Sequence, residues 1–453
     1  MRADRSRLPV PGAGRPFHFP QIDKSGLGNG LRVWTVNHSS IPVVTLSLLI
    51  RRGAADDPPG REGLAALTVD MMDEGSGTLS AIEIHEALAR VGGQLDSDIG
   101  ADGTVLTVTC LSRFLGPALS LLADIVARPS LHEQDFERVR QLRLHRLTQL
   151  RDMPGAVADR AFVKLLYGNH PYGHTPLGTE PSLSSLRIDD VREFHQAVIR
   201  PGDATLVIAG DCDHADVERL AETAFGQWTG ATANRPPRAP ALPHPARLNV
   251  IPRVGAPQSE LRIGHVGVSR STPDYHALVA ANMVLGGQFV SRINLNLREH
   301  KGLTYGARTS FDFRRMAGPF SLQVSVQTAG TAQAIHESID EISAIRGSRP
   351  VTADELALGV AALTRGYARN FETAEQLGRA VTQLALYDLP NDYFDTFVPT
   401  IEHVTPGEIT RVTSEYLDPS RLTTLVVGDL DAIANDLGPL DLGHAALLSA
   451  DTF

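Results

Sequence analysis

The chain has 453 residues, of which 42% are hydrophobic and 21% charged, and its formal net charge is -10. This apolar content excludes a disordered chain, and the length allows two or three domains at roughly 150 residues each. The negative charge argues against a nucleic-acid-binding protein. No apolar run reaches the roughly 18 residues that a membrane helix needs, so we expect no contact with a membrane.

The first 20 residues, MRADRSRLPVPGAGRPFHFP, are basic but contain no apolar stretch. A secretory signal is therefore not expected, and the prediction is a cytoplasmic protein, or a periplasmic one if the N-terminus is misassigned. The two cysteines, Cys110 and Cys212, are too few for a disulfide framework or a cysteine zinc site. We expect both to be small buried apolar residues.

The first half of the chain alternates strand and helix patterns. Residues 43–50 (VVTLSLLI) and 103–111 are typical of strands, and a helix pattern follows the second of these. Residues 132–150 predict a long charged helix. Residues 186–211 then predict a capped helix, a turn after proline and an apolar strand that ends in Gly-Asp.

A proline-rich segment separates this half from the next. Residues 233–250 contain five prolines and show no apolar periodicity, which is typical of a stiff, extended linker. The sequence thus predicts an N-terminal domain over residues 20–232 and a C-terminal domain over residues 251–440.

The second half repeats the first. Residues 404–429 follow the same pattern as residues 186–211, so that Val404 corresponds to Leu186, an offset of 218 residues. Residues 318–342 correspond in the same way to the strand and helix that begin at Gly103. We therefore predict an α+β fold of two homologous, duplicated domains, each a largely antiparallel sheet covered by helices on one face.

Metal-binding motifs are absent from the sequence in their standard forms. Neither HExxH nor HxxEH occurs among the sixteen histidines, and the nearest approach is NLREH at residues 296–300, where asparagine replaces the first ligand. We interpret that segment as a solvated helix face. The loop with His170 and His174 could bind a metal, but its turn residues favour a packed turn. No nucleophile elbow, P-loop or dinucleotide fingerprint is present.

Four segments resemble one known family. They are GLAALTVDMMDEGS at residues 63–76, YGNHPYGHTPLG at 167–178, LVIAGD at 206–211 and SRINLNLREHKGLTYG at 291–306. In this order they are similar to the pitrilysin/insulinase family of inverzincin zinc metallopeptidases, and the resemblance covers almost the whole chain. It implies the fold of that family, a half-shell of two related domains.

The chain departs from this family at the zinc motif. The family's helix carries His-x-x-Glu-His, which provides two zinc ligands and a general base. The matching positions here are Ala66, Val69 and Asp70, and the family's distal glutamate ligand falls near Arg146. We therefore expect no zinc or other cofactor in this chain, and no peptide hydrolysis by the chain alone.

The C-terminal half retains a different pair, Arg298 and Tyr305. In heterodimeric members of the family, one subunit supplies zinc and the other an Arg/Tyr pair that completes the active site. The resemblance implies that this chain is the second kind of subunit. Its partners would be a homologous zinc subunit that carries HxxEH, and a peptide or unfolded polypeptide substrate.

Two other functions stay open from the sequence. The chain could be a non-proteolytic structural or assembly subunit, as in the core proteins of a respiratory complex. It could also belong to a protease that matures a peptide from a neighbouring pathway. Arg298 and Tyr305 argue against a scaffold, which has no need of this pair.

Overall fold

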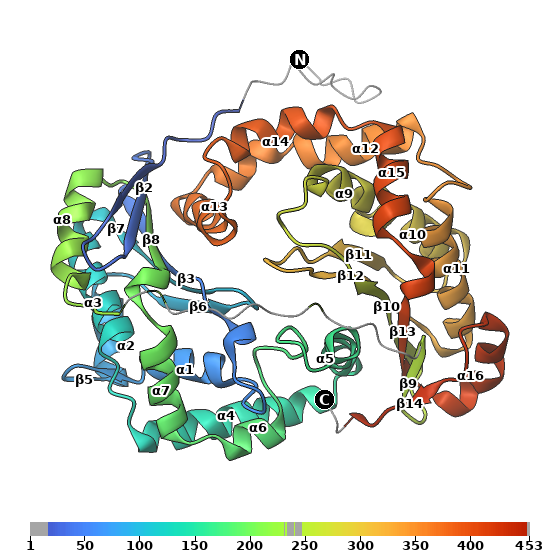
Figure 1. Cartoon of the computed structure of the whole chain (residues 1–453), viewed down its shortest axis with the longest axis horizontal. Helices are drawn as coiled ribbons and strands as arrows, with labels where there is room; N and C mark the ends of the chain where they lie inside the picture. The colour runs from blue at the N-terminus through green and yellow to red at the C-terminus, as the bar shows by residue number, and fades with distance from the viewer. Residues whose placement is uncertain (1–16, 231, 233–239, 241–246, 451–453) are drawn as a thin grey trace, which may run out of the picture.

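The computed structural model describes residues 17–230, 232, 240 and 247–450. Two six-stranded sheets form the two halves of the molecule, which surround a common centre (Figure 1). The strand order is β1-β2-β8-β3-β7-β6 in the first sheet and β14-β9-β13-β10-β12-β11 in the second. Five strands of each sheet share one topology, β2-β8-β3-β7-β6 and β9-β13-β10-β12-β11, with β2 parallel to β8 and β9 parallel to β13. The sixth strand differs, because β1 is antiparallel to β2 whereas β14 is parallel to β9. The predicted duplication is thereby confirmed at the level of the fold.

Most neighbouring strands are antiparallel, as predicted. In the first sheet, Leu48 of the central strand lies opposite Leu106 and Leu206 of its two neighbours. The additional parallel pair in the second sheet joins β14 to β9. The strands are β1 (Asp23–Gly26), β2 (Arg32–Asn37), β3 (Val43–Ile50), β6 (Leu95–Ile99), β7 (Thr104–Leu111) and β8 (Ala204–Gly210), then β9 (Leu248–Pro252), β10 (Gln258–Val266), β11 (Ala307–Phe311), β12 (Pro319–Gln327), β13 (Thr423–Gly428) and β14 (Ala446–Leu447). A short hairpin adds β4 (Gly75–Ser76) and β5 (Leu79–Ser80).

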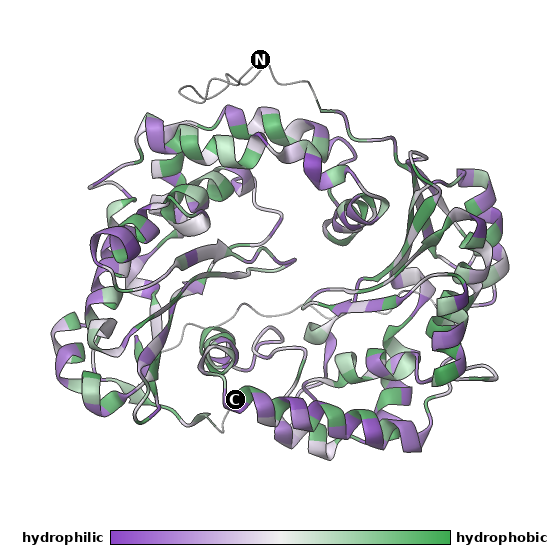
Figure 2. Cartoon of the chain, turned by 180° about the vertical axis from the view of Figure 1, so that it is seen from behind, coloured by the Kyte–Doolittle hydropathy of each residue, from purple (hydrophilic) through white to green (hydrophobic). Residues whose placement is uncertain are grey.

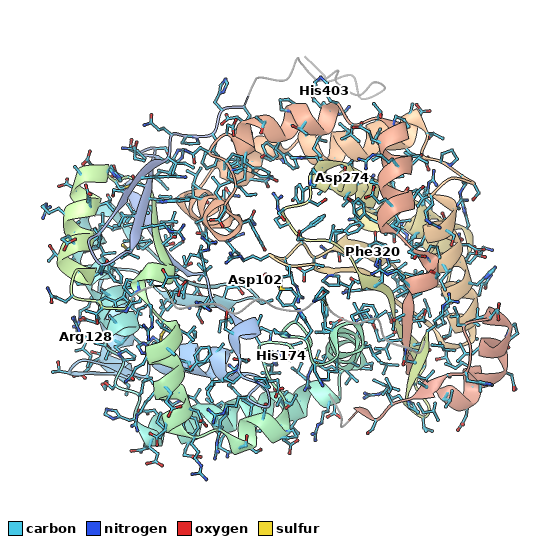
Figure 3. The ribbon with its side chains drawn as sticks, viewed as in Figure 1. Asp102, Arg128, His174, Asp274, Phe320 and His403 are labelled. Atoms are coloured by element: carbon cyan, nitrogen blue, oxygen red, sulfur yellow. The ribbon has the colours of Figure 1, made fainter. Side chains whose placement is uncertain are left out.

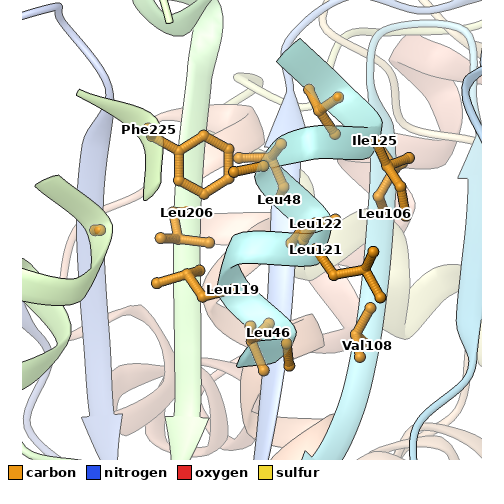
Figure 4. Close-up of a cluster of buried hydrophobic side chains, with 14 of the residues drawn as sticks. Leu46, Leu48, Leu106, Val108, Leu119, Leu121, Leu122, Ile125, Leu206 and Phe225 are labelled. Atoms are coloured by element: carbon orange, nitrogen blue, oxygen red, sulfur yellow. The ribbon is translucent and has the colours of Figure 1, made fainter. Parts of the chain in front are cut away.

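Amphipathic helices cover the outer face of each sheet, and their apolar sides are turned inward (Figure 2). Figure 4 shows Leu119, Leu122 and Phe225 packed on Leu48 and Leu206 of the first sheet. The helices on this side are α2 (Ala81–Arg90), α3 (Leu115–Ala127) and α8 (His214–Phe225). The second sheet is covered by α9 (Tyr275–Asn282), α11 (Thr331–Ala344), α15 (Pro406–Tyr416) and α16 (Leu430–Leu437), with α12 (Ala353–Thr364) beside them.

The inner faces are covered by helices that the two halves exchange. Helix α5 (Pro154–Tyr167) of the N-terminal half packs on β10 and β13 of the second sheet, and Phe162 contacts this core. Helix α13 (Ala374–Tyr387) of the C-terminal half packs on β2, β3 and β8 of the first sheet through Leu377, Val381 and Leu384. Figure 1 shows α13 beside the first sheet and α5 beside the second. The sequence predicted helices on one face only, and the exchange provides the second.

Buried polar contacts add to this interlock. Asp102, near the centre of the molecule in Figure 3, accepts a hydrogen bond from the Tyr172 hydroxyl at 2.6 Å and another from the backbone N–H of Arg315 at 2.8 Å. Arg262 on β10 donates to Asp159 on α5 at 2.7 Å. The contacts of Arg315 with Asp102 and of Arg262 with Asp159 join the two halves, so the chain forms one interlocked body.

The domain boundaries differ in detail from the predicted ones. Residues 248–250 were assigned to the linker but begin β9, because Leu248 and Val250 are buried in the second core. The second sheet continues past residue 440 into β14. Residues 233–239 and 241–246 of the predicted linker lie outside the described part of the chain.

Because α5 and α13 each pack on the sheet of the other half, a substitution in one of these helices should destabilise the half that it covers. Replacement of Leu384, a fully buried residue of α13, by alanine should lower the free energy of unfolding by about 2–5 kcal/mol, because it leaves a cavity. Trp34 and Trp228 are packed in cores that contain strands of the first sheet. Their fluorescence during urea denaturation should therefore report the loss.

The control is Leu358→Ala, at a side chain of α12 that is 57% exposed, which should change stability by less than about 0.5 kcal/mol. An unchanged tryptophan transition in Leu384→Ala, with circular dichroism shifted, would show that the halves unfold independently.

Candidate functional site

Helix α1 (Leu64–Met72) contains the three positions that match the family's zinc motif. Ala66 and Val69 are only 2% and 4% exposed, and they offer no donor atom. The helix begins at Gly63, whose φ of 95° and close contact with Gly178 leave no room for a side chain. The carboxylate of Asp57 accepts from the N–H groups of Gly63 at 2.7 Å and Ala65 at 2.6 Å, which caps the helix. The local fold is therefore kept while the ligands are gone.

An ion pair occupies the remaining position. Asp70 is bound by Arg143 of α4 (Glu133–Arg151), which also donates to the carbonyl of Pro176 at 2.9 Å. Glu74 pairs with Arg138 of the same helix. Burial raises the pKa of Asp70 and Arg143 opposes this shift. The first ion pair thus joins α1 to α4, the helices that metal ligands join in the family, and the second joins α4 to the segment just after α1.

Asp70 is bound by Arg143 and not by Arg146, the residue near the predicted distal ligand position. Arg146 is exposed on α4, one turn beyond Arg143. Sequence reasoning missed Arg143, although the run RVRQLRLHR, opposite the acidic end of α1, was a usable signal. Neither arginine can coordinate a cation.

The two loop histidines are packed, as predicted. His174 lies 3.0 Å from the Asp57 carboxylate and 2.9 Å from the carbonyl of Ala54, between the two halves in Figure 3. The Nδ1 atom of His170 accepts from the backbone of Tyr172 at 3.0 Å. Across the residues that the structure describes, no three His, Cys, Asp or Glu side chains are arranged to hold a metal ion. The residues present do not fit zinc.

The NLREH segment is a solvated helix face only at its end, because Leu297 is fully buried while Glu299 and His300 are exposed. Asn296 donates to Glu337 and Glu341, each at 2.9 Å. His300 is exposed at the end of a π-helical turn, Leu295–His300, that continues α10 (Arg292–Asn294).

Arg298 lies on this π-helical turn, and its guanidinium carbon is 3.4 Å from the centre of the Phe289 ring. Its Nε donates to Glu299 at 2.8 Å. Tyr305 follows seven residues later and is 95% exposed. Within the described part of the chain, Arg298 and Tyr305 make no hydrogen bond to each other.

Backbone contacts fix the loop that presents Tyr305. The hydroxyl of Thr304 donates to the carbonyl of Ser325 on β12 at 2.7 Å and accepts from the N–H of Gly306 at 3.1 Å. The buried amide of Asn294 exchanges two hydrogen bonds of 2.8 Å with the backbone of Ala307. Thr304 is therefore held to β12 and Ala307 to Asn294, while the side chain of Tyr305 projects into solvent.

A partly buried ion pair anchors the helix that leads to Arg298. Arg292 donates to both carboxylate oxygens of Glu355 at 2.7 Å and to the carbonyls of Arg349 and Pro350. The hydrogen bonds from Arg292 lower the pKa of Glu355 to about 2. This bidentate geometry is the strongest kind of charge-assisted contact.

One exposed apolar ring, that of Phe289, lies against Arg298. Phe289 is 66% exposed, and Val290, Leu295 and Tyr305 are also exposed. Beside them lies a cavity of about 450 Å³, lined by residues that include Phe289, Asn294 and Gly306, and by polar residues of β10, β11 and β12. An exposed apolar group with polar neighbours is typical of a binding surface.

The remaining helices are α6 (Glu180–Ser185) and α7 (Ile188–Val198), which pack against α1 and α4, and α14 (Tyr393–Glu402), which packs beside α13. In the described part of the chain, no helix is both long and apolar enough to cross a membrane.

Comparison with known proteins agrees with this architecture. The profile described as "Insulinase (Peptidase family M16)" matches residues 32–180, and that described as "Peptidase M16 inactive domain" matches residues 185–363. The chain is 25% identical to the uncharacterized zinc protease YmxG of Bacillus subtilis, over 72% of this chain and 79% of that protein. It is 23% identical to an uncharacterized zinc protease of Streptomyces coelicolor, over 90% of both.

Solved structures show the same fold. A peptidase M16 inactive domain from Pseudomonas fluorescens superimposes with a TM-score of 0.84 at 22% identity, over 90% of this chain and 98% of that one. A protease from Helicobacter pylori gives 0.83 at 20% identity, over 90% and 99%.

The chain belongs to the insulinase family of peptidases, M16. Within it, the chain is a zinc-protease-like member in which Ala66, Val69 and Asp70 stand at the positions of the zinc motif.

A first prediction concerns zinc. Zinc sites in proteins need three or four N, O or S donors in fixed geometry, which α1 and α4 do not provide. The purified chain should hold no stoichiometric zinc after dialysis, as measured by elemental mass spectrometry. One tightly bound zinc per chain would contradict the description of this site.

A second prediction concerns the Arg292–Glu355 anchor. The folded pKa of Glu355, about 2, lies below its ordinary value of 4.5. Its stabilising contribution is therefore complete above about pH 4.5 and is lost as the pH falls toward 2. At pH 7, Glu355→Gln should lower the free energy of unfolding by about 1–3 kcal/mol.

The difference from wild type should shrink in acid, as measured by urea denaturation at several pH values. Glu86→Gln, which removes an exposed helical pair with Arg90, should cost less than about 0.5 kcal/mol and serves as control. A penalty for Glu355→Gln that did not change between pH 7 and pH 3 would rule out the ionic role.

Proposed function

We propose that this chain is the non-zinc subunit of a two-subunit metallopeptidase, in which Arg298 and Tyr305 act on a peptide held at the zinc site of a homologous partner that carries HxxEH. The observation that carries the proposal is the position of Tyr305. Its side chain is 95% exposed, although Thr304 before it bonds to β12 and Gly306 after it bonds to Thr304. An aromatic ring left in water forgoes roughly 1.5–3 kcal/mol of burial free energy. Such a residue is better explained by an occupant that covers it than by packing.

The chemistry of the pair suits peptide hydrolysis. The partner's zinc would polarise a water molecule for attack on the peptide carbonyl. The phenol hydroxyl of Tyr305 would donate a hydrogen bond to the oxygen that becomes negatively charged, and Arg298 would hold the substrate backbone with its planar N–H donors. Neither group changes its covalent state. They position the substrate and stabilise charge.

The surroundings of the pair support a partner at this surface. Phe289 exposes apolar area against Arg298 and also lines a cavity of about 450 Å³. Val290 and Leu295 are exposed as well. A stable contact with the zinc subunit would bury at least roughly 1,000 Å² in total. The net charge of -10 argues against nucleic acid as a ligand. We also propose that the complex is cytoplasmic.

Co-expression with a homologous zinc subunit tests the proposal. The two chains should elute together in size-exclusion chromatography and hydrolyse peptides, while this chain alone should not. Tyr305→Phe should lower kcat by on the order of 100-fold, the usual effect of one oxyanion donor. Arg298→Ala should cost at least as much, and Arg298→Lys should restore little, because a point charge does not reproduce a planar fork.

Two matched substitutions serve as controls. Tyr416→Phe removes a hydroxyl on α15, where it donates to Asp274, and Arg219→Ala removes an exposed arginine of α8. Both should leave turnover unchanged, and all variants should keep the partner's zinc and the elution position of the complex. Wild-type turnover in Tyr305→Phe and Arg298→Ala would instead favour a structural subunit.

A further inference from the structure

The contacts of Arg298 identify two more residues that act on its position. Its guanidinium stacks on the Phe289 ring, with 3.4 Å between the guanidinium carbon and the ring centre. Its Nε and Nη2 atoms both donate to one carboxylate oxygen of Glu299. One neighbour therefore holds the plane of the guanidinium, and the other occupies two of its donors.

Phe289 has little else to do in the fold. Its ring is 66% exposed and is not part of the described apolar cores. Its backbone is nevertheless fixed, because the carbonyl of Gln288 accepts from the Asn294 side chain at 3.1 Å and from the N–H of Ser291 at 3.2 Å. A fixed backbone that carries an exposed ring is suited to support another side chain.

The geometry of stacking explains what this support does. A guanidinium that lies flat on a ring keeps all its N–H groups in the plane, pointing sideways to acceptors. Glu299, on the same helical turn, supplies such an acceptor within the chain. A carbonyl or carboxylate of a bound peptide would need the donors that Glu299 occupies.

We propose that Phe289 is a positioning residue that sets the plane of Arg298, and that Glu299 is an internal competitor for the substrate group that Arg298 binds. This inference rests on the proposed role of Arg298. It deepens that role by naming the ligand chemistry, a carbonyl or carboxylate oxygen in the plane of the guanidinium.

Steady-state kinetics of the complex with the zinc subunit test both residues. Phe289→Leu keeps an apolar side chain but removes the π face, and should lower kcat/KM about two- to fivefold, the worth of an exposed cation–π contact. Phe289→Tyr keeps the π face and should have the wild-type kcat/KM. Glu299→Gln should lower KM by about two- to threefold, as expected when an exposed ion pair is removed. In an Arg298→Ala background, neither substitution should have a further effect.

A measurement on the chain alone tests the stacking without the partner. In wild type, the Nε–H proton of Arg298 should show an upfield ring-current shift in the NMR spectrum, which Phe289→Leu should abolish and Phe289→Tyr should keep. The melting temperature should be the same in all three proteins, since the ring is exposed.

The outcomes separate the two proposals. If Arg298→Ala and Tyr305→Phe leave turnover unchanged, the proposed function fails. If both reduce turnover while Phe289→Leu and Glu299→Gln match wild type, or if the ring-current shift is missing, this further inference fails and the proposed function stands.

Discussion

The inner face of each sheet depends on a helix that the other half supplies. Without α13, apolar side chains of β2, β3 and β8 such as Val36, Leu49 and Val207 would face water, and without α5 the same would hold for Leu425 and Val427 of β13. Burial of apolar area is the largest favourable term in folding, so the halves are stable together rather than separately. The Arg298 segment and the α1–α4 pair therefore keep one relative placement. Any opening that admits a substrate must occur between this chain and another, or by movement of loops.

The α1–α4 contact shows how the family fold persists without its metal. In a zinc site, ligands on two helices are joined through the ion. Here the ion pair Asp70–Arg143 joins the same helices, Glu74 just after α1 pairs with Arg138, and Ala66 and Val69 bury apolar side chains on α1. The Asp57 carboxylate caps α1 and contacts His174, which holds the helix in place without a metal. Loss of the donors removes the chemistry and leaves the architecture.

Much of the fold could be predicted from the sequence, because a duplication forces one topology on both halves. Residues 404–429 match residues 186–211 in sequence, and the strands that end these segments, β13 and β8, take equivalent places in the two sheets. The exchange of α5 and α13 could not be predicted, since an apolar helix face does not reveal which sheet it covers. Residue counting placed the ligand position of α4 near Arg146, whereas Arg143, one turn earlier, reaches Asp70.

The sequence predicted which residues form the candidate site, but not their exposure or their contacts. The spacing of Arg298 and Tyr305 was visible in the sequence, but the exposure of Tyr305 follows from Thr304 and Asn294, which bond to β12 and β11 across the fold. The stacking of Phe289 on Arg298 depends on a loop and a π-helical turn, for which the sequence carries no periodic signal. Side chains set by such long-range contacts require the structure.

The central claim is that this chain completes an active site whose zinc lies in another subunit. The most direct measurement is a titration of a fixed amount of the homologous zinc subunit with increasing amounts of this chain, with peptide hydrolysis as the readout. The account predicts that activity rises and then reaches a plateau at one chain per zinc subunit. Activity that is the same with and without this chain would contradict it.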